Sequence, residues 1–450
     1  MVIGDRHNKT QIKHLGNGLI LRRATHADSE QLSAFNARIH KQEDSDQPDQ
    51  RISEWTHDLM IRPHPTFNTA DITIVEDLNS KKIVSTLALI SQTWSYAGID
   101  FKVGRPELVG TDPEYRERGL VRAQFDTIHE WSAERGELVQ GITGIPYYYR
   151  QFGYEMGLEL GGGRSGFIQQ TPKLEGDEPF SLRLATDSDL PFLVELYSKS
   201  NERYLVSCVR AEHLWRYELS GRSPQNVNHS VIKIIESNSD GALGYISHPP
   251  YRWGAMMAVT GYEIKAGVSW ASITPTVIRH LASVGEEYPA EYDKKGDLET
   301  FGFWLGSQHP VYDVIPDKLP KVRDPYAWFL RVPDLQKFIQ HIVPQLEARL
   351  RTSPMIGHSG EIKLTFYGSG LRLVLEGGRL VAVEDWKPQP DRNSGDAGFP
   401  ELTFLQLVFG YRSLSELKYS FADCWTRGDQ TAILLDILFP KMASSVWPVS

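Results

Sequence analysis

The chain has 450 residues, enough for two to four domains, and 40% hydrophobic with 23% charged residues is ordinary globular composition. Its formal net charge of −9 disfavours nucleic acid as a partner and favours a cationic small molecule or a basic peptide. Cys208 and Cys424 are too few for a disulfide framework and have no metal-ligand spacing, so we expect them to be reduced and buried, with no metal site. No signal peptide or membrane-length apolar run is visible, which predicts a soluble, cytoplasmic protein without a membrane partner.

The chain opens with a strand and a helix. Residues 1–17 are polar, and we expect them to be frayed. Residues 19–28 are typical of a strand that passes into a helix, with Thr25 or Asp28 as the N-cap. The acidic segment 42–50 is interpreted as a solvated connector, whose carboxylates are also candidates for attracting a cation.

Several strands follow this first helix. Segments 72–76 and 83–90 are expected to form a hairpin, because the turn-forming residues 77–81 separate them. Segments 101–103 and 107–111 are expected to continue the same sheet.

An arginine-rich turn then leads into an amphipathic helix, which we expect to begin at about Arg116 and to end at Gly136. The first four amides of a helix have no intrahelical partner, and Gly119 allows close approach to them. Arg118 and Arg122 add positive charge that opposes the helix dipole, which predicts a bound pyrophosphate. The alternative is a solvated basic surface. The buried face of the helix is predicted to carry Val121, Phe125, Ile128 and Ser132.

A further strand, 137–144, leads into an aromatic segment at 145–155. Tyr147, Tyr148 and Tyr154 are interpreted as core residues with satisfied hydroxyl groups.

The chain then repeats its opening. Residues 21–28 align with 182–189, 161 positions later, which predicts a duplicated unit. The copy has a Thr-Pro helix start at Pro275 but no Arg-x-x-Gly turn, and a proline in the first helical turn removes one amide. We therefore expect the copy to bind no such cofactor and to serve packing and pocket building.

A third unit begins near residue 331. A helical apolar face precedes a three-stranded meander at 362–366, 371–375 and 380–383. A polar loop at 387–398 follows, and further helices are expected at 403–409 and 431–439. The helical face is expected to consist of Leu335, Phe338, Ile339, Ile342, Val343 and Leu346.

Two motifs resemble those of GNAT acetyltransferases. Arg116-x-x-Gly119-x-Val121 is similar to the acetyl-coenzyme A loop Gln/Arg-x-x-Gly-x-Gly/Ala, with valine where Gly or Ala is usual. Tyr149-Arg-Gln-Phe152-Gly-Tyr154 is similar to the family's Tyr-x-x-Phe-Gly-Tyr pattern. The Arg-Gly-Leu-Val of this loop resembles the Arg-Gly-Leu-Leu of the enhanced intracellular survival (Eis) branch.

This resemblance implies an α/β (α+β) fold with two tandem GNAT-like mixed sheets flanked by helices and a sterol-carrier-protein-like C-terminal domain. It implies a catalytic unit at 1–166, a degenerate second GNAT-like unit at 167–330 and the C-terminal domain at 331–450. The Eis branch forms ring-like hexamers, which implies a homo-oligomer.

The resemblance also assigns residues to the site. Tyr149 is the implied general acid, which protonates the coenzyme A thiolate as it leaves. The C-terminal carboxylate of Ser450 is the implied general base or amine anchor, although the family usually ends in an aromatic residue; Glu107 or a water chain is the alternative base. The implied acetyl-coenzyme A contacts are Val109, Gly110, Thr111, Arg116, Glu117, Arg118, Gly119, Leu120, Val121, Arg122 and Gly144.

The leading hypothesis is an acetyl-coenzyme A-dependent N-acetyltransferase that acts by direct transfer on a primary amine. The resemblance implies an aminoglycoside-like polyamine or a lysine side chain as the acceptor. The alternative is a non-catalytic protein that binds a lipid or small ligand in its C-terminal domain. That alternative needs a pocket among Ile362, Leu364, Phe366 and the helix at 403–409.

Overall fold

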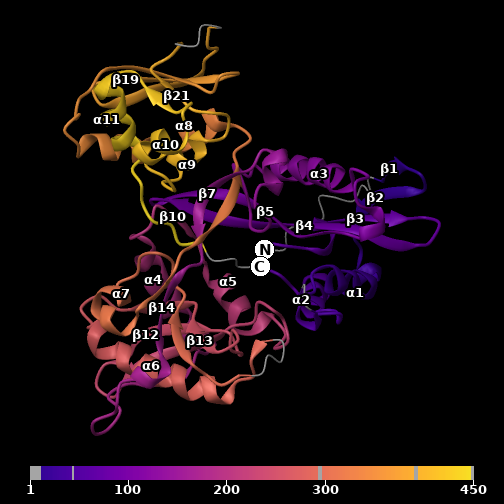
Figure 1. The fold of residues 1–450 in the computed structure, drawn as a ribbon, viewed down its shortest axis with the longest axis vertical. Coiled ribbons are helices and arrows are strands. Elements are labelled where there is room, and N and C mark those ends of the chain that lie inside the picture. Colours follow the sequence, from indigo (N-terminus) through magenta and orange to yellow (C-terminus); the bar gives the residue numbers. More distant parts are fainter. Residues whose placement is uncertain (1–11, 43–44, 292–295, 390–393, 447–450) are drawn as a thin grey trace.

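The computed structural model describes residues 12–42, 45–291, 296–389 and 394–446. They form three bodies (Figure 1): a long sheet with helices on both faces, a second body of sheets around one long helix, and a smaller body at the C-terminal end. This mixed α/β architecture is the predicted fold class. Within the described residues, no helix combines the length and apolarity needed to cross a membrane.

The first body is a mixed sheet in the order β1-β2-β3-β4-β5-β6-β17-β7, with β10 paired to β4. Its strands are β1 (Lys13–Gly16), β2 (Leu19–Arg23), β3 (Ile72–Asp77), β4 (Lys82–Tyr96), β5 (Ile99–Thr111), β6 (Val139–Ile142), β7 (Glu155–Leu160), β10 (Val206–Cys208) and β17 (Tyr326–Arg331). Helices α1 (Ser29–Ile39) and α2 (Gln50–Ile61) lie on one side of this sheet and α3 (Leu120–Glu134) on the other (Figure 1).

The structure confirms most of the elements expected in this body and adds β1, α2, β7, β10 and β17. Part of the segment expected to fray forms β1, which pairs with β2. Part of the segment expected to be a connector caps α2 instead, since the Asp49 side chain accepts hydrogen bonds from the Arg51 and Ile52 amides. The two short strands expected at 101–103 and 107–111 are one strand, β5.

The second body is built from two four-stranded sheets, β14-β12-β11-β9 and β13-β15-β8-β16. Its elements are β8 (Gly163–Phe167), β9 (Ser181–Leu184), α4 (Leu190–Asn201), α5 (Glu212–Arg216), β11 (Val231–Ser237), β12 (Gly241–His248), β13 (Met256–Val259), β14 (Gly261–Ile264), α6 (Trp270–Glu287), β15 (Thr300–Phe303), α7 (Val311–Val314) and β16 (Lys321–Arg323).

Strand exchange ties the first two bodies together. β8, which the sequence placed in the first unit, pairs with β15 and β16 of the second. β17, which the sequence placed in the second unit, lies between β6 and β7 of the first. The boundaries predicted at 166 and 330 therefore fall inside strands that pair with the neighbouring sheet.

The predicted repeat has matching side-chain chemistry in its two copies. Arg22 forms a two-pronged ion pair with Asp28, at 2.7 and 2.9 Å, and also binds Glu76. The Arg183 guanidinium binds Asp189 in the same way, at 2.7 Å for both oxygens, and also binds Glu236. In both copies the aspartate completes a capping box at the helix start. These equivalent contacts support a duplication.

We expect Asp189→Asn to destabilise the protein by roughly 2 kcal/mol at neutral pH, because it weakens a charged hydrogen bond and a helix cap. The ion pair with Arg183 lowers the pKa of Asp189 from 3.8 to about 2. The stabilising contribution is therefore present above pH 4 and is lost as the pH falls towards 2. Urea unfolding at pH 7 and pH 3 measures this, and an equal loss at both values would contradict it. Asp187→Asn, at an exposed neighbour, is the control.

The second unit's long helix begins differently from the expectation. α6 starts at Trp270 after the N-cap Ser269, whose side chain accepts from the Ser272 amide, so Pro275 lies in the second turn. The proline therefore does not remove a first-turn amide. One first-turn amide, that of Ser272, instead donates to the Ser269 side chain.

The third body packs against the far end of the first sheet. Its elements are α8 (Leu335–Arg351), β18 (Gly360–Thr365), β19 (Gly370–Glu376), β20 (Arg379–Asp385), β21 (Ala397–Gly398), α9 (Phe404–Val408), α10 (Leu414–Ser420), β22 (Trp425–Thr426) and α11 (Gly428–Leu438). The Phe101 and Phe338 rings are 5.5 Å apart, and the Tyr96 hydroxyl donates to the Val408 carbonyl at 2.8 Å. One continuous core therefore joins the two bodies.

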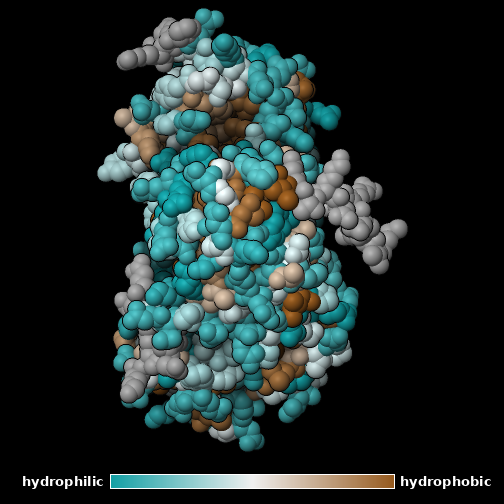
Figure 2. Space-filling model, turned by 90° about the vertical axis from the view of Figure 1, so that its right-hand side faces the viewer, coloured by the Kyte–Doolittle hydropathy of each residue, from teal (hydrophilic) through white to brown (hydrophobic). Residues whose placement is uncertain are grey.

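Figure 2 shows separate hydrophobic areas on a largely hydrophilic face. Cys208 and Cys424 are both buried, as expected.

Candidate active site

Strands β5 and β6 diverge after a short parallel contact, and we call the region between their diverging ends the V-shaped opening. They pair in parallel only at Val103–Val139 and Gly104–Gln140. Beyond these pairs, no β5–β6 pairing occurs in the described part of the chain, so the carboxyl-terminal half of β5 loses its neighbour on this side. An unpaired strand edge can form backbone hydrogen bonds with an extended ligand arm.

The start of α3 closes one side of this opening. The helix begins at Leu120 and not at Arg116 as expected, because Glu117 and Gly119 have left-handed backbone angles, with φ of +62° and +72°. Gly119 is the N-cap, and its carbonyl accepts from Ala123 at 3.1 Å. The amides of the first turn therefore begin with Leu120, and a Cβ at Gly119 would meet nothing within 4 Å. This combination of open space and free amides fits a diphosphate.

The predicted arginines surround this turn from the loop and the first turn of the helix. Arg116 and Arg118 are exposed, and Arg118 donates to the Glu114 carbonyl at 2.9 Å. Arg122 donates to the Gln151 side chain at 3.0 Å and lies over the Phe152 ring. The positive charge therefore remains available to an anion at the helix start.

The cofactor residues predicted on β5 lie along its splayed half. Val109 packs between the sheet and α3, while Gly110 lies against α1 on the other face. The Thr111 hydroxyl is 2.8 Å from that of Ser85, so this side chain is engaged within the protein. Leu108 has φ of +51°, where the register with β4 shifts, so a bulge separates Glu107 from these residues.

Tyr149 reaches the opening from a short 3₁₀ turn, η4 (Tyr148–Phe152). Its ring is buried against Phe125, with centroids 6.1 Å apart. A Cβ at Gly144 would be 3.1 Å from the Tyr149 hydroxyl, and Gly144 has φ of +137°, so glycine is required there. The hydroxyl makes no hydrogen bond with any residue that the structure describes. Burial, with a further contribution from the Glu107 carboxylate, raises the pKa of Tyr149, so the phenol stays protonated.

Glu107 lies on β5 near Tyr149. Burial raises the pKa of its carboxyl above the usual value, and the Arg105 guanidinium, its ion-pair partner, opposes this shift. Arg105 is fully buried and lies 4.8 Å from the centroid of the Trp328 ring. Trp328 belongs to β17, so this part of the site depends on the exchanged strand.

His40 is a candidate that the sequence did not reveal. It follows α1 and faces Gly110, where a Cβ would be 3.4 Å from its Nε2. That nitrogen is buried and has no hydrogen-bond partner among the described residues. Burial lowers the pKa of His40 to about 4, so the imidazole is neutral at pH 7. A lone histidine at a helix end gives no sequence signal for this position.

Of the three tyrosines interpreted as core beside Tyr149, Tyr154 is buried, Tyr148 is partly buried against the same cluster, and Tyr147 is exposed. Tyr154 is fully buried, and its hydroxyl is 2.9 Å from the His129 ring, as expected for a satisfied core residue. Tyr147 is 72% exposed, and Ile145 is 62% exposed. Because both lie between β6 and η4, they form an apolar lip beside the opening. The core interpretation of Tyr147 was wrong.

The predicted C-terminal base lies outside the described residues, which end at Val446. The Val446 carbonyl accepts a hydrogen bond of 3.0 Å from the Trp328 indole, next to Arg105. Ser450 therefore stays a prediction.

The apolar residues required by the ligand-binding alternative form part of a packed core. Ile362 and Leu364 are 2% and 0% exposed. The Phe366 and Phe404 rings are 5.5 Å apart. These residues contact one another, which does not favour the alternative.

Residues 21–157 match the family model for an acetyltransferase (GNAT) domain. No curated protein matches the chain by sequence. The fold is similar to that of a probable N-acyltransferase from Enterococcus faecalis V583, with 14% identity and a TM-score of 0.64 over 96% of this chain and 99% of that one.

Two further solved structures share the fold over the same portions, 96% of this chain and 99% of theirs. A GCN5-related N-acetyltransferase from Kribbella flavida has 18% identity and a TM-score of 0.61. Eis1 from Mycobacterium abscessus has 12% identity and a TM-score of 0.57. The prediction of an acetyltransferase enzyme with a GNAT domain is confirmed by the family match.

Proposed function

Starting from the GNAT domain at 21–157, we propose that the protein transfers an acetyl group directly from acetyl-coenzyme A to a primary amine. The observation that carries this proposal is the V-shaped opening, which has the α3 start at one side and the unpaired Tyr149 hydroxyl at the other. The diphosphate is held by the first-turn amides and the loop arginines, and the pantetheine arm extends along β5 at 109–111.

The reaction needs one proton acceptor and one proton donor. The neutral amine attacks the thioester carbonyl, and Glu107 accepts the amine proton directly or through a water. As the tetrahedral intermediate collapses, the C–S bond breaks and Tyr149 protonates the sulfur that leaves. Its raised pKa keeps the phenol protonated until this step.

The acceptor is proposed to be a cationic polyamine, such as an aminoglycoside, or a lysine side chain. The chain's net charge of −9 attracts such molecules. The exposed Ile145 and Tyr147 side chains offer apolar contact for the carbon skeleton beside the reacting amine. By its helices and antiparallel meander, the third body is proposed to be sterol-carrier-like in fold, with a structural role.

The proposal is tested with the purified full chain. Calorimetry with acetyl-coenzyme A measures cofactor binding, and thiol release with a panel of polyamines, aminoglycosides and lysine peptides measures transfer. Tight cofactor binding together with transfer to at least one amine is the expected result. If calorimetry detects no binding of acetyl-coenzyme A, the proposal is wrong. If the cofactor binds but no amine causes thiol release, the result counts against catalysis.

We expect Glu107→Gln to lower kcat by about 100-fold, because the amide cannot accept the amine proton. In the wild type, kcat/KM should rise with pH as Glu107 deprotonates through its raised pKa, and this rise should be absent in the variant. A pH–rate profile at saturating acetyl-coenzyme A measures both effects. Glu130→Gln, on the exposed face of α3, is the control. A variant that keeps the wild-type profile would exclude Glu107 as the base.

A further inference from the structure

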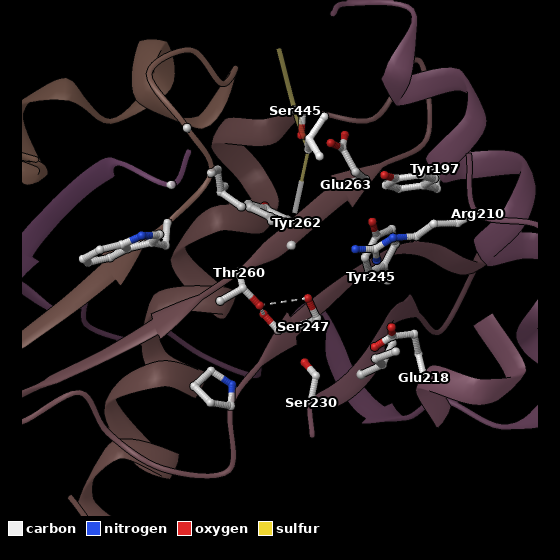
Figure 3. Close-up of a pocket in the computed structure, with 18 of the residues that line it drawn as sticks. Tyr197, Arg210, Glu218, Ser230, Tyr245, Ser247, Thr260, Tyr262, Glu263 and Ser445 are labelled. Atoms are coloured by element: carbon white, nitrogen blue, oxygen red, sulfur yellow. Dashed lines mark hydrogen bonds between the residues drawn. The ribbon is translucent and has the colours of Figure 1, made fainter. Parts of the chain in front are cut away.

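The second body contains a polar cavity of about 150 Å³. It is lined by α4, α5, β12 and β14, together with Glu159 and the tail segment 444–446 (Figure 3). Since α4 follows β9 as α1 follows β2, the cavity lies on the face that corresponds to the α1 face of the first unit. Its volume equals that of about five water molecules, which suits a ligand of amino-acid size.

Arg210 places a guanidinium in this cavity that is near the Glu218 carboxylate but forms no ion-pair contact with any described residue. Its guanidinium makes ring contacts with Tyr197 and Trp215, at 5.0 and 5.2 Å, but no hydrogen bond or ion pair with any described residue. Its Nε atom is buried and has no partner. Figure 3 shows the side chain extending from the wall towards the centre, beside Tyr245.

Other polar atoms of the lining are also buried without partners. Glu218 is 7% exposed, and its Oε1 has no partner, although Oε2 accepts from Arg222 at 2.5 Å. Buried polar atoms in folded proteins nearly always have partners, so several orphans around one cavity indicate a polar ligand. The remaining orphans of the lining are Trp215 Nε1, Asn228 Nδ2, His229 Nδ1 and Ser444 Oγ.

The charges of the lining define the ligand. Glu218 is paired with Arg222, and Glu263 with Arg203 at 2.5 Å. Arg210 and Glu159 are the charged groups of the lining that form no ion pair with a described residue, and a ligand carboxylate can bind the Arg210 guanidinium with two parallel hydrogen bonds. A ligand with two negative charges would be repelled by the Glu218 and Glu263 carboxylates, which does not favour a dianion. The free oxygen of Glu218 accepts from a donor on the ligand.

We propose that this cavity binds a small carboxylic acid that carries an amino or hydroxyl donor, with amino acids as the class that fits best. The carboxylate lies on Arg210, and the donor faces Glu218. The hydroxyls of Ser247 and Thr260, 3.3 Å apart across the cavity wall in Figure 3, contact the remaining polar groups.

The experiment is calorimetry and thermal shift on the full chain with the twenty amino acids, small hydroxy acids, the matching carboxamides and inorganic phosphate, all without acetyl-coenzyme A. At least one acid should raise the unfolding temperature in a concentration-dependent way. Its carboxamide should bind at least about tenfold more weakly, because the charged hydrogen bonds to Arg210 are lost.

Variants locate the site. Arg210→Met keeps the ring contacts without the charge and should weaken binding at least tenfold, whereas Arg216→Met, on the exposed face of α5, should leave it unchanged. Ser247→Ala, a milder change, decides the question if Arg210→Met does not fold. The proposal is overturned if no acid binds at millimolar concentration, if carboxamide or phosphate binds as tightly, or if neither cavity variant weakens binding.

Discussion

Replacing Tyr149 with phenylalanine should lower kcat at least about 100-fold and leave the affinity for acetyl-coenzyme A and the thermal stability unchanged. The reason is that the hydroxyl makes no hydrogen bond with any described residue, so its removal leaves no partner unsatisfied. The ring keeps its contacts with Phe125 and Phe329. Without the phenol, coenzyme A must leave as an unprotonated thiolate. Steady-state kinetics, cofactor calorimetry and a melting curve on one preparation measure the three quantities.

Tyr154→Phe is the matched control. It removes a hydroxyl from an equally aromatic environment, but this hydroxyl is bonded to His129 at 2.9 Å. We expect a loss of about 1 kcal/mol of stability and little change in kcat. The reverse pattern, in which Tyr154→Phe abolishes turnover and Tyr149→Phe does not, would show that the acid is a different residue.

The sequence allowed most local elements to be predicted, because capping and alternation are local signals. The capping boxes at Asp28 and Asp189 mark the two helix starts and the duplication together. Strand partners are not local. β17 is an apolar run that the sequence analysis did not predict as a strand, and nothing in it indicates a place between β6 and β7, about 170 residues earlier in the chain.

The site could be predicted only in outline. The motifs identified Gly119 and Tyr149 as candidate site residues. The start of α3 was predicted too early, because Arg116 and Glu117 favour helix in isolation. The positive φ of Glu117 depends on the packed loop. Arg105 lies on the same strand as Glu107 but belongs to no motif, and only the folded chain brings Trp328 and His40 to that strand. The aromatic character of Tyr147 did not show whether its side chain packs in the core or lies exposed beside the opening.

Gly119→Asp should weaken acetyl-coenzyme A binding at least 100-fold, with little loss of helix stability. Aspartate is one of the few residues other than glycine that adopt the left-handed conformation of Gly119, with φ of +72°, so the added backbone strain should be small. Its carboxylate would lie where the diphosphate is proposed to bind, and two like charges at about 4 Å repel by about 4 kcal/mol at an effective dielectric constant of 20.

Gly119→Asn has the same shape without the charge and should bind with intermediate affinity. Gly136→Asp, with φ of +68° and equal space at the other end of α3, should bind normally. Calorimetry and melting curves of the three variants separate charge from backbone strain. Equal loss of binding in Gly119→Asp and Gly136→Asp would place the diphosphate elsewhere, because only the first is expected to face it.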